Sequence, residues 1–388
     1  MAATEFGNGS LEEPINHEYR GRDLVSGTPF QPPPCHLRFY ATPPFPPSPP
    51  PPPSPPPAAR SRRRYAIRRR ISFLTPPQLA FHRNHGAIPA TDPTAHTLTI
   101  SSDSSSSNSN DVALPARFPS KTLTADQLAR DFPQHRLTCA LQCAGNRRHT
   151  MRTRLKEVQG IDWFDGALMN CVWEGPLLRD VLVWAGVEEE ALRLKRQWEG
   201  KKEEGERTQE EGMRGEEEGG GGDAAADNIL YDGLHVQFAC HLVATQDDGY
   251  YGGSIALRRA MDPEMEVILA LKCNTRPLTL AHGSPIRSLV PGHPGARSVK
   301  WLTHITISTH ESPCYYQQRD YKVLPPEAVD SGSADEWWAK TEAMGDLGVN
   351  SGVGVPEEGE TVKLGGGASG QGWAVPLGMG GGRCPGCG

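Results

Sequence analysis

The stretch LQCAGNRR, residues 141–148, brings a thiol together with fixed positive charge. Cys143 follows an apolar, strand-like run and precedes a small-residue turn that ends in Arg147 and Arg148. Neighbouring guanidinium groups lower the pKa of a thiol, and they supply planar donors that suit an oxyanion. The stretch therefore favours a reactive or metal-binding thiolate beside an anion pocket.

Four interpretations of Cys143 are open from these residues alone. A buried, inert cysteine is the commonest fate of a single thiol. A disulfide or metal pair with Cys139 is weak, because four residues along a strand separate the two side chains by about 13 Å. A cysteine nucleophile needs a histidine partner, and no local signature indicates one. The fourth interpretation is a soft thiolate ligand for a redox metal.

Strand and helix patterns surround this stretch and must position it. Strand-like patterns occur in HTLTI, HVQFAC, EVILALKCN and VKWLTHITIST, and RLTCALQCAG predicts a buried strand that ends at a glycine turn. GPLLRDVLVWAGV has apolar residues at helical spacing between Pro176 and Gly186, and GGSIALRRAMDP predicts a second short helix. Short helices among strands and long loops predict an α+β fold.

Several segments differ in composition from this compact part. Residues 43–57 are mostly proline, and residues 60–70 form an arginine-rich cluster. We expect residues 1–72 to be disordered, with the cluster serving as a solvated arm, a nuclear address or a patch for an anionic surface. A serine tract at 101–110 and a Glu/Gly/Lys-rich stretch at 188–227 predict two insertions without a core of their own.

Composition and charge argue against some classes of function. The formal net charge of −6 argues against nucleic-acid binding, because duplex binders normally present a basic face. The sequence contains no run of about 18 apolar residues, so we expect no transmembrane helix and no membrane partner. The N-terminus lacks the apolar core of a secretory signal, and nine cysteines over a long chain do not resemble a secreted disulfide framework. We therefore expect a cytoplasmic protein.

Six segments, in order along the chain, resemble the sulfite oxidase family of molybdopterin enzymes, which also includes the molybdenum domain of eukaryotic nitrate reductases. Several long motifs in one order are far more specific than any single short pattern. The segments are FHRNHGAIP (81–89), LQCAGNRR (141–148), GALMNCVWEGPLLRDVL (166–182), YGGSIALRRAMDPEMEVILA (251–270), HGSPIRSLVPGHPGARSVKWL (282–302) and QRDYK (318–322).

The resemblance implies a mixed α+β molybdopterin-binding domain over residues 73–325, interrupted by the two insertions. Family members continue into an immunoglobulin-like β dimerisation module. PEEGETV (356–362) and GQGWAVPLGMGGGR (370–383) resemble its first two strands, so we expect residues 326–388 to be a truncated form of it. Two strands do not form a stable sandwich alone, which puts the homodimer expected of the family in doubt for this chain.

The resemblance also implies a set of site residues. Cys143 is the implied protein ligand to molybdenum, Arg83 and Arg148 bind the anionic substrate, and Tyr321 is the active-site tyrosine. The implied cofactor-binding residues are Phe81, His82, Arg83, Asn84, His85, Cys143, His282, Arg287, Ser298, Val299 and Lys300.

Two features depart from the family pattern. An aspartate expected before YGGSI falls on Val243, and neither Asp247 nor Asp248 is a secure substitute, so this cofactor contact is unassigned. Cys384 and Cys387 form one CxxC, which is weak evidence for zinc without a second pair.

The implied cofactor is molybdenum-molybdopterin, and the implied reaction is oxygen-atom transfer that converts sulfite to sulfate. Two electrons then pass to a separate acceptor. No haem, flavin or nicotinamide module is expected on this chain, and eukaryotic nitrate reductases carry such modules, so sulfite oxidation is favoured over a nitrate-reductase-like activity. A catalytically inactive binding or scaffold protein with a proline-rich docking segment is a third hypothesis. The family's occurrence in mitochondria makes that compartment the alternative location.

Overall fold

The computed structural model describes residues 73–76, 79–102, 119–154, 160–187, 231, 233–348, 350–355 and 371–375. Several sequence predictions lie outside the described residues: the disordered region 1–72, the serine tract beyond residue 102, the insertion at 188–227, the strand at 356–362 and the CxxC at 384–387. Within the described residues, no helix is both long enough and apolar enough to cross a lipid bilayer.

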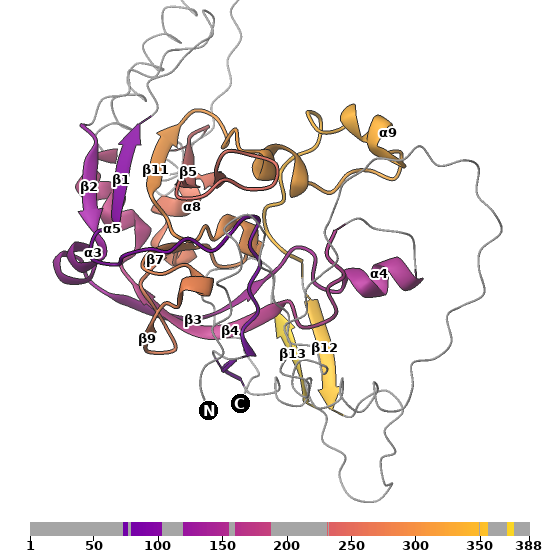
Figure 1. Ribbon diagram of the computed structural model, residues 1–388, viewed down its shortest axis with the longest axis horizontal. Helices are drawn as coiled ribbons and strands as arrows, with labels where there is room; N and C mark the ends of the chain where they lie inside the picture. Colours follow the sequence, from indigo (N-terminus) through magenta and orange to yellow (C-terminus); the bar gives the residue numbers. More distant parts are fainter. Residues whose placement is uncertain are drawn as a thin grey trace, which may run out of the picture.

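The larger of two main sheets has five strands in the order β2–β1–β11–β5–β6 (Figure 1). These strands are β1 (Thr97–Ser102), β2 (Lys121–Thr124), β5 (His235–Cys240), β6 (Tyr251–Ala256) and β11 (His304–Ser308). β1 and β11 run parallel, and the other neighbouring strands are antiparallel. Leu98 and Ile100 of β1 are fully buried, which is the period of two expected from HTLTI.

Two helices share the core of this sheet. α5 (Leu178–Ala185) buries one apolar side, and it ends at Gly186, whose φ of 102° is the left-handed conformation that favours glycine. The helix predicted between Pro176 and Gly186 is therefore confirmed. α8 (Leu257–Met261) lies against α5, and its buried Leu257 and Ala260 belong to the same core as β1 and β5.

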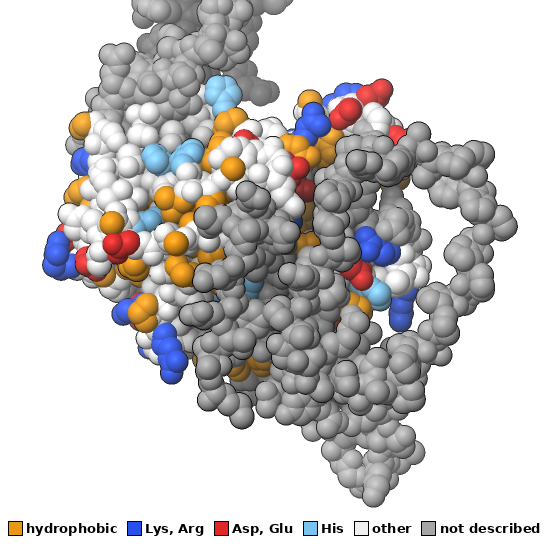
Figure 2. Space-filling view, in the orientation of Figure 1, with side chains coloured by type: hydrophobic (Ala, Val, Ile, Leu, Met, Phe, Trp, Pro, Cys, Tyr) orange, Lys and Arg blue, Asp and Glu red, His pale blue; other side chains and the backbone are white. Residues whose placement is uncertain are grey.

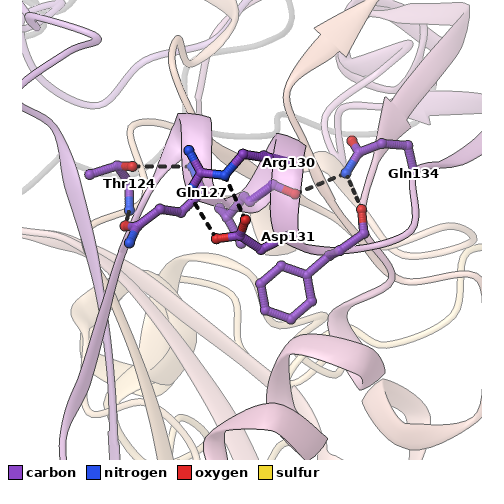
Figure 3. Close-up of polar contacts among 7 residues, drawn as sticks. Thr124, Gln127, Arg130, Asp131 and Gln134 are labelled. Carbon is purple, nitrogen blue, oxygen red and sulfur yellow. Dashed lines mark hydrogen bonds and ion pairs between the residues drawn. The ribbon is translucent and has the colours of Figure 1, made fainter.

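A third helix, α3 (Ala125–Asp131), shows how a short element is fixed by its ends (Figure 3). The Gln127 backbone N donates to the Thr124 hydroxyl over 3.2 Å, and the Thr124 backbone N donates to Gln127 Oε1 over 2.8 Å. Gln134 Nε2 donates to two carbonyls at the other end of the helix. These bonds pair terminal groups that the helix itself leaves unsatisfied, and they fix the entry into the next strand.

The second main sheet is antiparallel, in the order β3–β4–β8–β9. Its strands are β3 (His135–Gln142), β4 (Leu168–Gly175), β8 (Lys272–Cys273) and β9 (Arg276–Pro277), and a separate pair joins β7 (Ile268–Ala270) to β10 (Arg287–Leu289). A second core cluster that includes fully buried Trp173 covers one face. β3 buries Leu137 and Leu141 but exposes Thr138 between them, so the predicted buried strand is buried on one face only.

Two segments differ from the sequence prediction. GGSIALRRAMDP is predicted as a helix, but β6 occupies its first part and α8 only its second. Pairing of β6 with β5 along six residues overrides the helical spacing there, because tertiary context outweighs local propensity. EVILALKCN forms two strands, since β7 pairs with β10 while β8 pairs with β4.

The remaining α-helices and strands are α4 (Arg148–Arg154), α9 (Ser331–Asp335) and an antiparallel pair, β12 (Asn350–Val355) with β13 (Gln371–Val375). Three short 3-10 helices and a π-helix complete the described elements: η2 (Pro263–Met265), η3 (Leu280–His282), η4 (Gly295–Arg297) and η5 (Tyr316–Asp320). Figure 1 shows β12 and β13 side by side and apart from the five-stranded sheet. The sequence prediction puts the first strand of the pair at 356–362, whereas the strand that pairs with β13 ends at Val355. The described residues therefore form a mixed α+β structure, with one strand pair in the predicted C-terminal module.

Gly175 offers a test of the junction between β4 and β7. A Cβ there would lie 1.9 Å from the Leu269 carbonyl oxygen, and that oxygen belongs to backbone that cannot move independently. We predict that Gly175→Ala lowers the free energy of unfolding by about 1–3 kcal/mol, as overpacking of a core does. Urea denaturation should show this as a lower midpoint. Gly249→Ala is the matched control, because a Cβ at Gly249 meets nothing within 4 Å; equal effects of the two variants would contradict the packing argument.

Candidate active site

A pocket with about 740 Å³ of empty space, part of it open to solvent, lies where segments from distant parts of the chain meet. Its walls come from residues 81–86, the end of β3, residues 240–251, the loops between 282 and 301, and Tyr321. All predicted site residues except Arg148 and Val299 line it. The predicted residues in its walls are Phe81, His82, Arg83, Asn84, His85, Cys143, His282, Arg287, Ser298, Lys300 and Tyr321.

Cys143 is buried at the end of β3, where its side chain forms part of the pocket wall beside Leu141 and Met169. Its backbone N donates to the Ala167 carbonyl over 2.9 Å, which holds the residue after the strand has ended. Cys139 is not in the pocket wall, and no group of three or more His, Cys, Asp or Glu side chains among the described residues could hold a metal ion. Among the described residues, two cysteines line the pocket: Cys143, and Cys240 at the end of β5, which the sequence analysis did not single out. Cys240 also belongs to the core of the larger sheet, and burial raises the pKa of its thiol to about 11.

The two arginines that follow Cys143 do not line the pocket. Arg147 adopts φ 69°, and its side chain turns to Asp165 Oδ1 at 3.0 Å and Asn350 Oδ1 at 2.9 Å. Arg148 NH1 donates to the Ile161 carbonyl over 2.8 Å. Adjacency in sequence therefore does not bring either guanidinium into the wall, and the anion-binding role of Arg148 stays a prediction.

Positive charge is instead concentrated in the pocket by residues from two segments, 81–86 and 282–301. Arg83, Arg287 and Lys300 line it, and the described residues in its wall include no Asp or Glu. Burial lowers the pKa of Lys300 well below its usual value, and the charges of Arg287 and Arg83 lower it further. On the face shown in Figure 2, by contrast, the Lys and Arg side chains of the described residues lie at several separate places. The buried cations repel one another and favour an anionic ligand.

Arg287 shows that this group is built for a ligand. NH1 donates to the His282 carbonyl over 3.0 Å and NH2 to the Ser298 carbonyl over 2.9 Å. Nε is buried and has no hydrogen-bond partner among the described residues. Burial lowers the pKa of Arg287 to about 10. Because an unpaired buried donor is costly, a phosphate or another anion in the pocket would stabilise this arrangement.

The neighbouring loop shows why one predicted residue is absent from the wall. Ser298 and Lys300 face the pocket, whereas Val299 between them is fully buried in the core of the larger sheet. The Val299 backbone N donates to Ser288 Oγ over 2.8 Å. Val299 therefore anchors the loop in the core, while the two residues beside it form part of the pocket wall.

A hydrogen-bonded chain links Arg83 to Tyr321 through His85. Arg83 NH2 lies 3.2 Å from His85 Nδ1, and His85 Nε2 lies 2.7 Å from the Tyr321 hydroxyl oxygen. Burial and then the charges of Arg83 and Lys300 lower the pKa of His85 well below its usual value, so the ring is neutral near pH 7. A guanidinium only donates, so Nδ1 accepts and Nε2 carries the proton.

This tautomer determines what Tyr321 can do. The His85 Nε2–H donates to the Tyr321 oxygen, which leaves the phenol hydrogen for another acceptor. Burial raises the pKa of Tyr321 well above its usual value, so the phenol stays protonated. The arrangement therefore presents an O–H donor beside Arg83 and Cys143 in the same pocket.

The molybdopterin-binding domain of oxidoreductases matches residues 85–316 of the chain. The chain belongs to this family. Human sulfite oxidase, a mitochondrial protein, is 34% identical over 301 residues, which cover 76% of this chain and 43% of the human protein. Nitrate reductase [NAD(P)H] of Hordeum vulgare is 32% identical over 297 residues, 75% of this chain and 27% of that protein. The chain thus spans less than half the length of either relative.

Among solved structures, the chain resembles the sulfane dehydrogenase SoxCD from Paracoccus pantotrophus, with a TM-score of 0.47 and 19% identity. That likeness covers 73% of this chain and 53% of the other.

The residues of the pocket fit the cofactor of the family. A soft thiolate ligand and buried cations suit a molybdenum ion held by sulfur and a pterin that ends in phosphate. Phe81 and His82 contribute ring surfaces, since Phe81 packs edge-on against Trp163 and His82 against His282. Lys300 Nζ donates to Asn84 Oδ1 and to the Ala281 carbonyl, which fixes its charge at the wall.

The pocket also contains residues that the sequence analysis left unassigned. Val243 lines it, and so does Thr245, whereas Asp247 accepts from the Tyr316 hydroxyl at 2.9 Å and Asp248 accepts from the Tyr315 backbone N at 2.9 Å. Neither aspartate lines the pocket. The position of the missing aspartate is therefore apolar here. Thr245 could have been proposed as a site residue because it lies just before the segment YGGSI, but no spacing rule distinguishes it from its neighbours.

Trp301 and Tyr251 are further wall residues that were missed. Trp301 Nε1 donates to the Leu280 carbonyl over 2.8 Å, and the Tyr251 hydroxyl donates to the Ala296 carbonyl over 2.9 Å. Each ring thus closes the wall while its polar atom is satisfied elsewhere. Both residues lie inside segments that resemble the sulfite oxidase family, and this position could have identified them as site residues.

The lowered pKa of His282 predicts how the free energy of unfolding depends on pH. Burial, then the charges of Lys300 and Arg287, lower its pKa to about 3 from an ordinary value of 6.5. The unfolded chain therefore binds a proton between these values that the folded chain does not, and stability is lost as pH falls through this window. The loss is at most about 1.4 kcal/mol per pH unit.

We predict that His282→Asn flattens the pH dependence of the unfolding free energy between pH 4 and pH 6.5. Urea denaturation of the wild-type chain and the variant at several pH values measures it, and the carboxylates common to both cancel in the difference. Parallel curves for the two proteins would show that the pKa of His282 is the same in the folded and unfolded chains.

Proposed function

We propose that this chain is a molybdenum-cofactor-dependent oxidoreductase that oxidises sulfite to sulfate by oxygen-atom transfer. The observation behind the proposal is the Cys143 thiol in the wall of a buried pocket whose charged side chains, among the described residues, are all cationic. The family membership supports a molybdenum cofactor. Sulfite oxidases from several animals are among the relatives, which supports sulfite as the substrate.

The proposed roles divide the pocket into two regions. Cys143 would hold molybdenum, and Arg287, Lys300 and His282 would surround the phosphate of the pterin. Ser298, Phe81, His82, Asn84 and His85 would line the cofactor, and Val299 would support the loop from behind. When bound, the cofactor supplies oxygen-atom transfer and accepts two electrons, which then leave for a separate acceptor.

The substrate would lie beside Arg83 and Tyr321. Arg83 provides the charge that attracts an oxyanion, and its fixed hydrogen bond to His85 limits its freedom before substrate arrives. Tyr321 donates the hydrogen that His85 leaves available. Arg148 would join the substrate site once its guanidinium leaves the Ile161 carbonyl, so we assign it a smaller effect than Arg83.

Nitrate reduction is the second candidate function. A nitrate reductase of Hordeum vulgare matches the chain with an identity within a few per cent of that of human sulfite oxidase. Nitrate is a planar oxyanion and sulfite is a pyramidal one. A guanidinium can bind either, so the charge of the pocket does not distinguish the two substrates. Turnover of each anion with an artificial redox dye separates them directly.

Three further expectations belong to the same proposal. Residues 73–325 would form the molybdopterin-binding domain, and β12 with β13 would belong to an immunoglobulin-like dimerisation module. We propose a cytoplasmic location, with a mitochondrial one as the alternative.

The function is tested by metal analysis and turnover of the purified, cofactor-loaded chain. We predict bound molybdenum and pterin together with dye-linked oxidation of sulfite. Cys143→Ser should keep the fold but lower turnover by at least about 100-fold, because a hydroxyl poorly replaces a soft thiolate. Turnover of nitrate alone would select the second candidate, and a folded chain without molybdenum or pterin would indicate a binding protein.

The two arginines are tested by comparing their effects on KM. Arg83→Gln should raise the KM for sulfite about 10-fold or more, since it removes a charge at the pocket wall. Arg148→Gln should raise KM less, because Arg148 lies outside the wall. Arg276→Gln, at an exposed position on β9, is the control and should leave KM unchanged. A larger effect at Arg148 than at Arg83 would reverse the assignment.

A further inference from the structure

Three cysteines lie in neighbouring strands of the second sheet, away from the pocket wall. Cys139 on β3 is directly opposite Cys171 on β4, and Cys273 on β8 is directly opposite Trp173 on β4. Cys171 and Trp173 are two residues apart, so their side chains lie on the same face of β4. All three thiols therefore project from one face of the sheet, next to the second core cluster.

Cys273 is the diagonal neighbour of Cys171 on this face, because it is opposite Trp173, and the two thiols are close enough to shift each other's pKa. The contact is held by the turn that follows β8, because Asn274 Nδ2 donates to Cys171 Sγ over 3.7 Å and Asn274 Oδ1 accepts from the Val172 backbone N over 3.0 Å. Asn274 and Thr275 both adopt positive φ, 49° and 67°, which is the tight turn of a two-residue hairpin. The turn thus fixes Cys273 beside Cys171.

The two thiols differ in exposure and in acidity. Cys171 is buried, whereas Cys273 is partly exposed, and both are free thiols. The pKa of Cys273 is lowered, chiefly by a hydrogen bond from Cys171 and further by the charge of Arg287, against the opposing effect of burial. The pKa of Cys171 is raised by the same contact and by burial. Cys273 is therefore the nucleophile of the pair, and Cys171 is the protonated partner.

We propose that Cys171 and Cys273 form a redox-sensitive dithiol that a peroxide or a small-molecule disulfide oxidises to an intramolecular disulfide between β4 and β8. This site lies outside the pocket, and the inference does not depend on the proposed function. Cys139 is directly opposite Cys171, but it is not the reactive partner, because burial raises the pKa of its thiol to about 12.

With hydrogen peroxide, the Cys273 thiolate attacks one oxygen, the O–O bond breaks, and a sulfenic acid forms while water leaves. The Cys171 sulfur then attacks the sulfur of Cys273, the S–S bond forms, and the hydroxyl leaves as a second water with the Cys171 proton. Two thiols thus lose two electrons and two protons, and one peroxide is reduced to two waters. With glutathione disulfide, two exchange steps release two glutathione thiols.

Arg287 connects this pair to the pocket wall. Its guanidinium carbon lies 5.4 Å from the centre of the Trp173 ring, which is paired with Cys273, and its charge acts on both thiols. The disulfide would replace an ionisable thiol by a neutral group on the far side of Arg287 from the pocket.

The experiment uses the full reduced chain, treated with hydrogen peroxide or with a glutathione redox buffer, then alkylated and digested without reduction. Mass spectrometry should find a cross-linked peptide that joins Cys171 to Cys273 and that dithiothreitol releases. Cys139→Ser should retain this cross-link, and Cys273→Ser should lose it. A Cys139–Cys171 peptide in its place would overturn the proposal. So would the absence of any cross-link under conditions that fully oxidise a reference peptide with an exposed thiol.

A second measurement on the wild-type chain does not require any variant to fold. Limited alkylation with iodoacetamide should label Cys273 faster than Cys171 and Cys139, because only a thiolate that solvent reaches reacts rapidly. Equal labelling rates of Cys273 and Cys139 would remove the basis for the pair's reactivity.

Discussion

The gathering of positive charge in one wall is the constraint on which the pocket depends. Arg83 lies before β1, whereas Arg287 and Lys300 belong to the segment 282–301, and burial lowers the pKa of both Arg287 and Lys300. Backbone carbonyls accept hydrogen bonds from Arg287 and Lys300, and two apolar cores fix the segments in place. An anionic ligand would offset this cost, so the charges of the wall favour anions over neutral or cationic ligands.

The two sheets divide the work of building this site. The second sheet delivers Cys143 at the end of β3, and the larger sheet buries Val299 so that its neighbours face the ligand. His85 links two parts of the chain that are far apart in sequence, since it contacts both Arg83 and Tyr321. The neutral imidazole fixes the direction of every hydrogen in this chain of contacts. The chemistry of the site therefore depends on a tautomer that burial imposes.

Local pattern predicted those elements whose periodicity and end signals agree. α5 is one, with apolar residues at helical spacing and a glycine at its end, and β5 is another, matching HVQFAC residue for residue. β6 was missed, because the same residues that look helical pair with β5 across the sheet. At the site, motif residues could be placed in one pocket from their family resemblance, but Arg148 and Val299 show its limit. Whether a side chain faces a cavity depends on a turn such as the one at Arg147, and sequence adjacency does not specify it.

One side chain of the C-terminal strand pair contacts the loop that carries Cys143. Asn350, at the start of β12, accepts from Arg147 and donates to Gln142 Oε1 over 3.2 Å, so a single side chain clasps the loop on both sides of Cys143. Arg147 holds a left-handed backbone, a conformation that costs a non-glycine residue energy and persists only under such external restraint. A displacement of β12 would therefore change hydrogen bonds on both sides of Cys143 at once. The backbone that positions this thiol thus depends on a strand more than 200 residues further along the chain.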